Sequence, residues 1–145
     1  MRKHLTKELK EIEKEIRTVI NEGHTPFSHH INFTQIQIIH YLLENKSIET
    51  CQKDFEAFLG LNKASISGSL DALEEKGLIK RTQSTEDGRK NIITLSQSYL
   101  DQQNSIQESL RELDRQLLEG ISEEEIDSFF LTLDKIHDNL KNVKK

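Results

Sequence analysis

The chain has 145 residues, of which 34% are hydrophobic and 31% are charged, and its formal net charge is -5. This length predicts one domain or two closely fused halves with a lean core, and the acidity argues against a protein that coats nucleic acid indiscriminately. Because Cys51 is the only cysteine, an internal disulfide framework is excluded, and no apolar run approaches the roughly 18–20 residues of a membrane span. We therefore expect a cytoplasmic protein without a membrane partner.

The first predicted helix spans residues 5–20, where apolar side chains recur at spacings of four and three. These side chains are Leu5, Leu9, Ile12, Ile16, Val19 and Ile20. The stripe is narrow and its flanks are nearly all charged, which fits a short heptad seam as well as an ordinary amphipathic helix. We favour a helix that pairs with a second subunit over one that packs only on its own core.

The second predicted helix follows a break at Gly23 and Pro26 and runs to about Asn45. Asn32 and Gln35 have the spacing of a capping box at its start. Two isoleucines that flank this box have the spacing of a hydrophobic staple. They are Ile31 and Ile36. These signals indicate a well-defined helix N-terminus.

A helix, a tight turn and another helix are predicted next. The first of the pair begins near Thr50 or Cys51 and ends at Gly60, and Asn62 can cap the second. The inward-facing residues of that second helix are Ile66, Leu70 and Leu73. Gly77 is placed to end it as the left-handed residue, with Lys76 in its last turn.

A hairpin is predicted from Leu78 to Ser96, reversed by the turn "TEDGRK". In its second strand the side chains of Ile92, Thr94 and Ser96 alternate with those of Ile93 and Leu95 between the two faces. Two cations of this turn, Arg89 and Lys90, directly follow Asp87-Gly88.

The charge is distributed unevenly along the chain. Residues 76–90 contain five cations and two anions, a net charge of +3, whereas residues 108–127 contain eight anions and two arginines, a net charge of -6. The overall acidity therefore does not contradict a basic, nucleic-acid-binding hairpin.

Two long helices complete the chain, at about Gln97–Glu119 and Glu123–Asn142. Ser122 and Glu125 form a second capping-box pattern ahead of the last helix. The apolar stripes of the two helices are Tyr99, Ile106, Leu110, Leu113 and Leu117, and Ile126, Phe130, Leu133, Ile136 and Leu140. Such stripes indicate helices that pack against partners.

The order of these elements predicts a mainly α fold with a small β-hairpin wing, that is, a winged helix-turn-helix. Residues 31–96 form its DNA-binding region, and residues 1–30 and 97–145 form a helical dimerisation region. The second helix of such a pair fits the major groove of B-DNA, which is about 12 Å wide, and the hairpin reaches the neighbouring backbone or minor groove. The two cations at the hairpin tip are then expected to meet phosphates.

Two stretches of the middle region carry a family resemblance. They read "LGLNKASISGSLDALEEKGLIKR" and "DGRKNIITLS", and "INFTQIQIIHYL" precedes them. These stretches resemble the MarR family of bacterial transcriptional regulators. The wing signature of that family is Asp-x-Arg followed by a short strand that ends in Leu-Thr, and here it reads Asp87-Gly88-Arg89 and Leu95-Ser96. The resemblance covers almost the whole chain in element order, and its specific part is residues 31–96.

The resemblance implies a homodimeric repressor that reads a pseudo-palindromic operator in double-stranded DNA and is relieved by a small ligand or by oxidation. It implies that Asp87 orients Arg89 and that Arg89 enters the minor groove. The candidate DNA-binding residues are Asn62, Lys63, Ala64, Ser65, Ser67, Gly68, Lys80, Arg81, Asp87, Arg89 and Lys90. The chain departs from its relatives at Gly68 and Ala72, where basic residues are common, so direct base readout by this helix is expected to be modest.

Three other interpretations stay open from the sequence. A metal-responsive regulator would use His24, His29, His30 and His40, which match no compact ligand motif, and we predict neither a metal site nor a cofactor. A redox-responsive regulator would use Cys51 at the start of a helix. A winged-helix dimer could also act mainly through protein–protein contact. No catalytic arrangement stands out, so we do not expect an enzyme.

Overall fold

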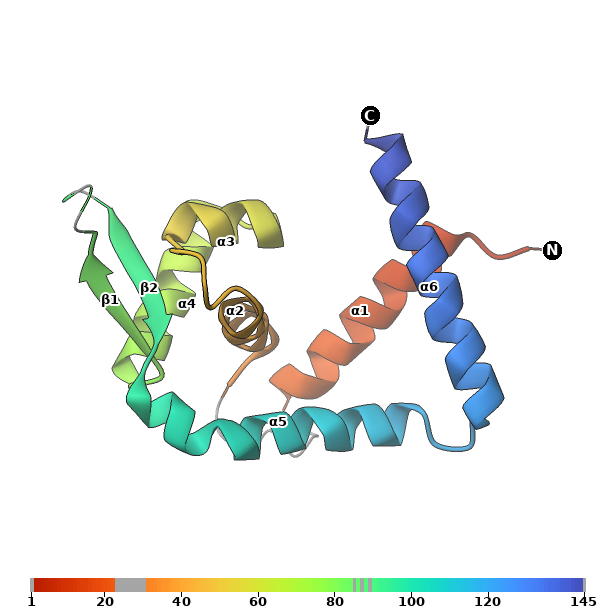
Figure 1. The fold of residues 1–145 in the computed structure, drawn as a ribbon. Coiled ribbons are helices and arrows are strands. Elements are labelled where there is room, and N and C mark those ends of the chain that lie inside the picture. Colours follow the sequence, from red (N-terminus) through yellow and green to blue (C-terminus); the bar gives the residue numbers. More distant parts are fainter. Residues whose placement is uncertain (1, 23–30, 85, 87, 89, 145) are drawn as a thin grey trace. The chain divides into compact units, whose positions relative to one another are not determined.

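The computed structural model describes residues 2–22, 31–84, 86, 88 and 90–144, apart from the side chains of residues 102–106 (Figure 1). Its elements are α1 (Leu5–Asn21), α2 (Phe33–Glu44), α3 (Gln52–Leu59), α4 (Lys63–Glu75), β1 (Ile79–Gln83), β2 (Asn91–Leu95), α5 (Gln97–Leu117) and α6 (Glu123–Val143). The predicted mainly α fold with a small antiparallel hairpin is confirmed. The chain divides into two compact units, residues 1–109 and residues 110–145, and each is described by itself.

Helix α2 begins with the predicted capping box. The Asn32 Oδ1 atom accepts a hydrogen bond from the Gln35 backbone N–H at 2.9 Å, and the Gln35 Oε1 atom accepts one from the Asn32 backbone N–H at 3.0 Å. Two of the N–H groups that a helix start leaves without intrahelical partners are thereby satisfied. The adjacent Ile31 and Ile36 are both buried, as a hydrophobic staple requires.

Helices α3 and α4 are delimited by their caps. Gly60 ends α3 in the left-handed conformation, with a φ of 66°, and the Asn62 Oδ1 atom accepts a hydrogen bond from the Ser65 N–H at 2.8 Å to start α4. Gly77, with a φ of 75°, closes α4 in a Schellman motif, because the Leu78 N–H reaches the Leu73 carbonyl at 3.0 Å. Lys76, which we expected in the last turn, is instead the C-cap residue just after that turn.

The core of the first unit lies where α2, α3, α4, the hairpin and the start of α5 meet. Its most buried large side chains are Ile38, Ile39, Phe55, Ile66, Leu70, Leu73 and Tyr99. The three inward-facing residues predicted for α4 are among them. Burying side chains of this size contributes about 1.5–3 kcal/mol each, so this cluster fixes α4 on the body of the unit.

The hairpin is paired in a register that places Ile79 opposite Leu95 and Gln83 opposite Asn91. The Ile93 N–H also donates to the Thr50 carbonyl at 2.8 Å, which ties β2 to the segment before α3. Ile92 and Ile93 are both buried although they point to opposite faces of the strand. Both faces of β2 are therefore buried at Ile92 and Ile93. Burial does not alternate there between a buried and an exposed face.

Each of the long helices presents apolar side chains that the described residues leave uncovered. In α1 only Ile20 is buried, and no residue of α6 is buried. The exposed large apolar side chains of these two helices are Leu5, Leu9, Ile12, Val19, Phe129, Phe130, Leu131, Leu140 and Val143. Among the described residues, we find no helix whose length and apolar content would allow it to cross a bilayer.

Candidate nucleic-acid interface

The exposed face of α4 carries mostly short side chains. Lys63, Ala64, Ser65 and Gly68 are exposed, whereas Ser67 is half-buried. An added Cβ atom at Gly68 would meet no atom within 4 Å. Packing within the described chain therefore gives no reason for a glycine in the middle of this helix, where it costs about 1 kcal/mol relative to alanine.

A basic hollow lies between the starts of α3 and α4 and the hairpin. Its lining residues are Cys51, Gln52, Lys53, Asp54, Glu56, Lys63, Arg81, Lys90, Asn91 and Ile93, and its volume is ≈ 690 Å³. Four cations face two carboxylates there, and the Asp54 Oδ2 atom already accepts a hydrogen bond from the Cys51 N–H at 2.8 Å. The hollow thus combines positive charge with the N-terminal end of α3, and both attract anions.

Sequence reasoning missed five polar residues of this basic hollow, namely Gln52, Lys53, Asp54, Glu56 and Asn91. The Gln52 Nε2 atom donates to the Lys63 carbonyl at 3.3 Å and so joins the starts of α3 and α4. Gln52 and Lys53 are the first two residues of α3, where backbone N–H groups lack intrahelical acceptors. That position was the signal that could have identified Gln52 and Lys53.

Arg81 connects the hairpin to α4. Its Nη2 atom lies 2.8 Å from the Asp71 Oδ1 atom, and its buried Nε atom has no hydrogen-bond partner among the described residues. Lys80 precedes it on β1 and is exposed. Because successive side chains of a strand point to opposite faces, only Arg81 of these two cations reaches α4.

The tip of the wing is described in part. Beyond the two strands, the Ser84 N–H donates to the Lys90 carbonyl at 2.8 Å, so the pairing continues toward the tip. Asp87 and Arg89 lie outside the described residues. Their assigned roles, in which Asp87 orients Arg89, stay predictions.

The histidines and the cysteine were the candidates for metal or redox sensing. His24, His29 and His30 lie outside the described residues, and His40 faces Glu44 of the same helix, with 2.7 Å between Nε2 and Oε1. Within the described part of the chain, no three potential metal ligands of the His, Cys, Asp or Glu type gather. Cys51 is half-buried and is the N-cap residue of α3.

A second, smaller cavity of ≈ 240 Å³ lies between α2, β2 and the first turn of α5. Its lining residues are Leu42, Asn45, Lys46, Ile48, Ile93, Thr94, Leu95 and Leu100. The wall is mainly apolar, with an amide and an ammonium group among its polar members. Sites for small organic molecules also combine a mainly apolar wall with a few polar groups, and their usual volume is about 300–1,000 Å³.

Comparison with known proteins agrees with this geometry. Residues 29–90 match the model of the MarR family. A crystal structure of MarR is similar over 98% of this chain and 94% of its own chain, with 19% identity and a TM-score of 0.82. The S. aureus MepR–DNA complex is similar over 94% and 96% of the two chains, with 24% identity and a TM-score of 0.68.

A third similar structure is the PcaV transcriptional regulator from Streptomyces coelicolor in complex with its natural ligand. The similarity covers 93% of this chain and 92% of that one, with 16% identity and a TM-score of 0.68. At these identities the solved structures establish the winged-helix fold, and the family match confirms the resemblance seen in the sequence. That family consists of transcriptional regulators rather than enzymes, as expected.

Proposed function

We propose that this chain, whose residues 29–90 match the model of the MarR family, is a sequence-specific DNA-binding regulator, and specifically a homodimeric repressor. The observation that carries the proposal is the basic hollow between α3, α4 and the hairpin. It places four cations beside the exposed face of a helix that can enter a major groove. Such a protein works where the chromosome is, so we place it in the cytoplasm.

In the proposed complex, α4 lies in the major groove and the hollow faces the phosphate backbone. Lys53, Lys63 and Lys90 neutralise phosphates, while the exposed hydroxyl of Ser65 and the methyl group of Ala64 meet base edges. Gly68 allows the helix backbone to approach the DNA closely. The wing extends this contact, and Arg89 enters the minor groove.

The proposed dimer is formed by the long helices, and the occupant of their uncovered apolar faces is a second copy of the chain. Helix α6 buries no residue, and α1 buries only Ile20, although both carry apolar stripes. Exposed stripes of this length on a monomer indicate subunit contact. A two-fold dimer reads two half-sites about one helical turn apart, which makes the operator a pseudo-palindrome.

We assign the response to a small effector to the ≈ 240 Å³ cavity. It joins the winged helix, through Leu42 and Ile93, to the dimerisation helix α5, through Leu100. A ligand that fits this cavity in only one arrangement of the two regions shifts the population toward that arrangement. The PcaV regulator, which has a similar fold, was solved in complex with its natural ligand, and this supports the assignment.

The second candidate is a winged-helix dimer that acts mainly through protein–protein contact. The observation that favours it is the charge of α4, in which Lys63 is the only cation. A helix with so few long donors makes few bidentate base contacts.

Selection of bound sequences from a random pool of DNA duplexes tests the proposal. We expect enrichment of a pseudo-palindromic motif whose half-sites are about 10 bp apart, and binding that weakens steeply with salt. Enrichment of a non-repeated motif would contradict the two-fold dimer. Absence of any salt-dependent binding would contradict the DNA-binding function and favour the second candidate.

A further inference from the structure

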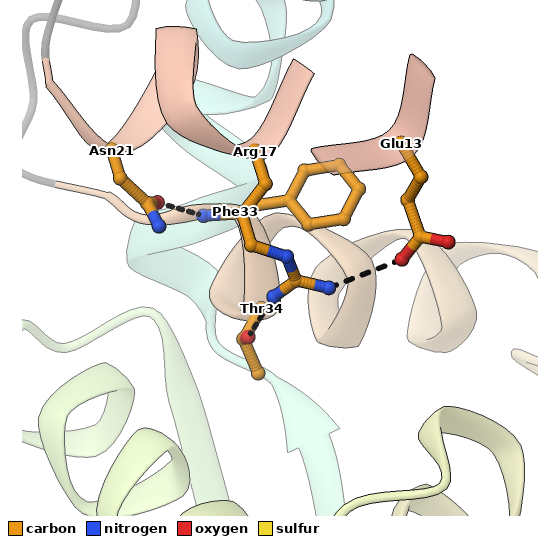
Figure 2. A network of polar contacts seen from close by, with 5 residues as sticks. All are labelled: Glu13, Arg17, Asn21, Phe33 and Thr34. Atoms are coloured by element: carbon orange, nitrogen blue, oxygen red, sulfur yellow. Dashed lines mark hydrogen bonds and ion pairs between the residues drawn. The ribbon is translucent and has the colours of Figure 1, made fainter. Parts of the chain in front are cut away.

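Helix α1 is attached to the start of α2 by an arginine that makes three contacts. The Arg17 guanidinium lies 4.7 Å from the ring centroid of Phe33, its Nη1 atom donates to Thr34 Oγ1 at 3.5 Å, and its Nη2 atom lies 3.1 Å from Glu13 Oε1 (Figure 2). The first two partners belong to α2, and the third belongs to α1. The planar guanidinium is therefore held against the first turn of α2 from one side.

Asn21, the last residue of α1, acts as a second cap for α2. Its Oδ1 atom accepts a hydrogen bond from the Phe33 N–H at 2.9 Å (Figure 2). This N–H is at the first position of α2, where a helix offers no acceptor of its own. The start of α2 is thus capped by Asn32 from its own segment and by Asn21 from the dimerisation helix.

The same capped turn also contacts the recognition helix. Gln35, which is buried, directs its Oε1 atom to the Asn32 N–H at 3.0 Å and to the Lys76 Nζ atom at 3.4 Å. Lys76 is the C-cap residue of α4. Polar contacts therefore run from α1, through the first turn of α2, to the end of the recognition helix.

We propose that Arg17 and Asn21 are positioning residues that set the angle between the dimerisation helix α1 and the recognition helix α4. The inference rests on the proposed function, because the angle matters only if two recognition helices of a dimer must engage one DNA duplex together. We use the name α2 joint for the first turn of α2, residues 32–35, together with its contacts to Arg17, Asn21 and Lys76.

The physical reason is geometric. A dimer gains affinity over a single winged helix only if the second recognition helix meets its half-site once the first is bound. An error in the angle between α1 and α4 is made twice, once in each subunit, and it displaces the second helix from its groove. Loss of the α2 joint is therefore expected to harm recognition of half-site spacing more than the affinity of one recognition helix.

The variants separate this role from ordinary stabilisation. Asn21→Ala removes the acceptor for the Phe33 N–H. Asn21→Asp keeps an oxygen acceptor at this position, in a carboxylate instead of an amide. Arg17→Lys keeps the charge but removes the planar group that stacks on Phe33. Lys14→Ala is the matched control, because Lys14 is an exposed cation of α1 whose side chain takes part in none of these contacts.

The first measurement is amide hydrogen exchange of the free protein. In Asn21→Ala, we expect the exchange of the Gly77 and Leu78 amides at the end of α4 to become about twofold faster or more, although Asn21 does not touch them. We expect no such change in Asn21→Asp or Lys14→Ala. Faster exchange confined to the first turn of α2 and to α1 would overturn the connection to α4.

The second measurement compares binding to duplexes with the selected half-site spacing, with one base pair inserted, and with one half-site only. We expect Asn21→Ala to reduce the preference for the selected spacing about fivefold, which corresponds to one lost cap, and Arg17→Lys to reduce it in the same direction. Their affinity for the single half-site should change less than about twofold. Equal losses on all three duplexes, or an unchanged preference, would overturn the proposal.

The two measurements also separate this inference from the proposed function. Wild-type protein that binds no duplex would refute the DNA-binding function, and hydrogen exchange at the end of α4 would still decide whether the α2 joint connects α1 to α4. Wild-type protein that binds a spaced operator, with variants that keep its spacing preference, would refute the positioning role alone.

Discussion

Asp71 of α4 and Arg81 of β1 form an ion pair, with 2.8 Å between the Oδ1 and Nη2 atoms. The Arg81 side chain is only 22% exposed, whereas that of Asp71 is 65% exposed. Arg81 therefore joins the wing to the recognition helix in the free protein, and its charge is partly neutralised there. The role of Arg81 as a direct DNA contact stays a prediction. To make that contact, the guanidinium of Arg81 would have to leave Asp71 or share its charge with it.

Asp71→Ala should strengthen non-specific binding to duplex DNA, because it removes an anion from α4 and releases the Arg81 guanidinium toward phosphates. The folded state should lose about 1 kcal/mol, since one partner of the pair is largely buried. Binding titrations at several salt concentrations and denaturant unfolding measure the two effects. Glu75→Ala is the control, because it removes an anion from the same helix, and equal effects of both variants would show that the pair does not sequester Arg81.

Gly68→Ala should change stability and DNA binding in opposite directions. The new methyl group meets no atom within 4 Å, so the helix should gain about 1 kcal/mol of stability from the better propensity of alanine. The same methyl group should weaken operator binding if the backbone of α4 approaches the DNA at this position. Thermal unfolding and binding titration of one preparation test both expectations, and a stabilised variant with unchanged affinity would place Gly68 away from the interface.

Ile12→Glu should weaken the homodimer. The Ile12 side chain is 51% exposed in the single chain, so a monomer would tolerate the glutamate, whereas a dimer interface would have to bury its charge. Sedimentation over a range of concentrations measures the dimer equilibrium. Thr18→Glu makes the same change of charge at another exposed position of α1, and an equal effect of the two variants would argue against a specific interface.

Tyr99→Phe should make the protein more resistant to alkaline unfolding. Burial raises the pKa of Tyr99 above its usual value of 10.0, and its hydroxyl has no hydrogen-bond partner among the described residues. The phenol of Tyr99 therefore has a higher pKa in the folded state than in the unfolded state. Its contribution to the free energy of unfolding is complete below the unfolded pKa. That contribution is lost as the pH rises through the folded pKa, because the unfolded state ionises first. Between pH 8 and pH 11, the free energy of unfolding should therefore fall less in Tyr99→Phe than in the wild-type protein. Denaturation at the two pH values measures this fall, and an equal fall in both proteins would contradict the expectation.

Local sequence signals predicted most of the fold. Helix ends could be predicted because each combines a particular residue type with a particular position. The structure contains the predicted caps at Asn32 with Gln35, at Asn62 and at Gly77. The helix ends deviated by one or two residues, as at Leu117, where α5 ends before the expected Glu119. End turns are held by single hydrogen bonds, so sequence patterns define them less sharply than a helix interior.

The candidate site was less accessible from the sequence. Charge counting found Arg81 and Lys90, and the family resemblance pointed to Lys63. Neither could show that Asp71, ten residues before Arg81, would pair with Arg81. That pair depends on the packing of β1 against α4. The contacts of Arg17 with the start of α2 were missed for the same reason, since they depend on how two different helices, α1 and α2, pack against each other.

The central claim is that the wing and the basic hollow bind DNA through its phosphates, and salt-dependent binding of Arg89→Ala tests it most directly. Affinities of wild-type protein, Arg89→Ala and the control Lys141→Ala in α6 would be measured for specific and unrelated duplexes at several salt concentrations, after folding and dimerisation are checked. The account predicts that Arg89→Ala weakens binding to both duplexes and reduces the slope of log K against log salt by about one, while Lys141→Ala changes neither. Unchanged affinity and slope in Arg89→Ala would show that the wing does not touch DNA, and would contradict the account.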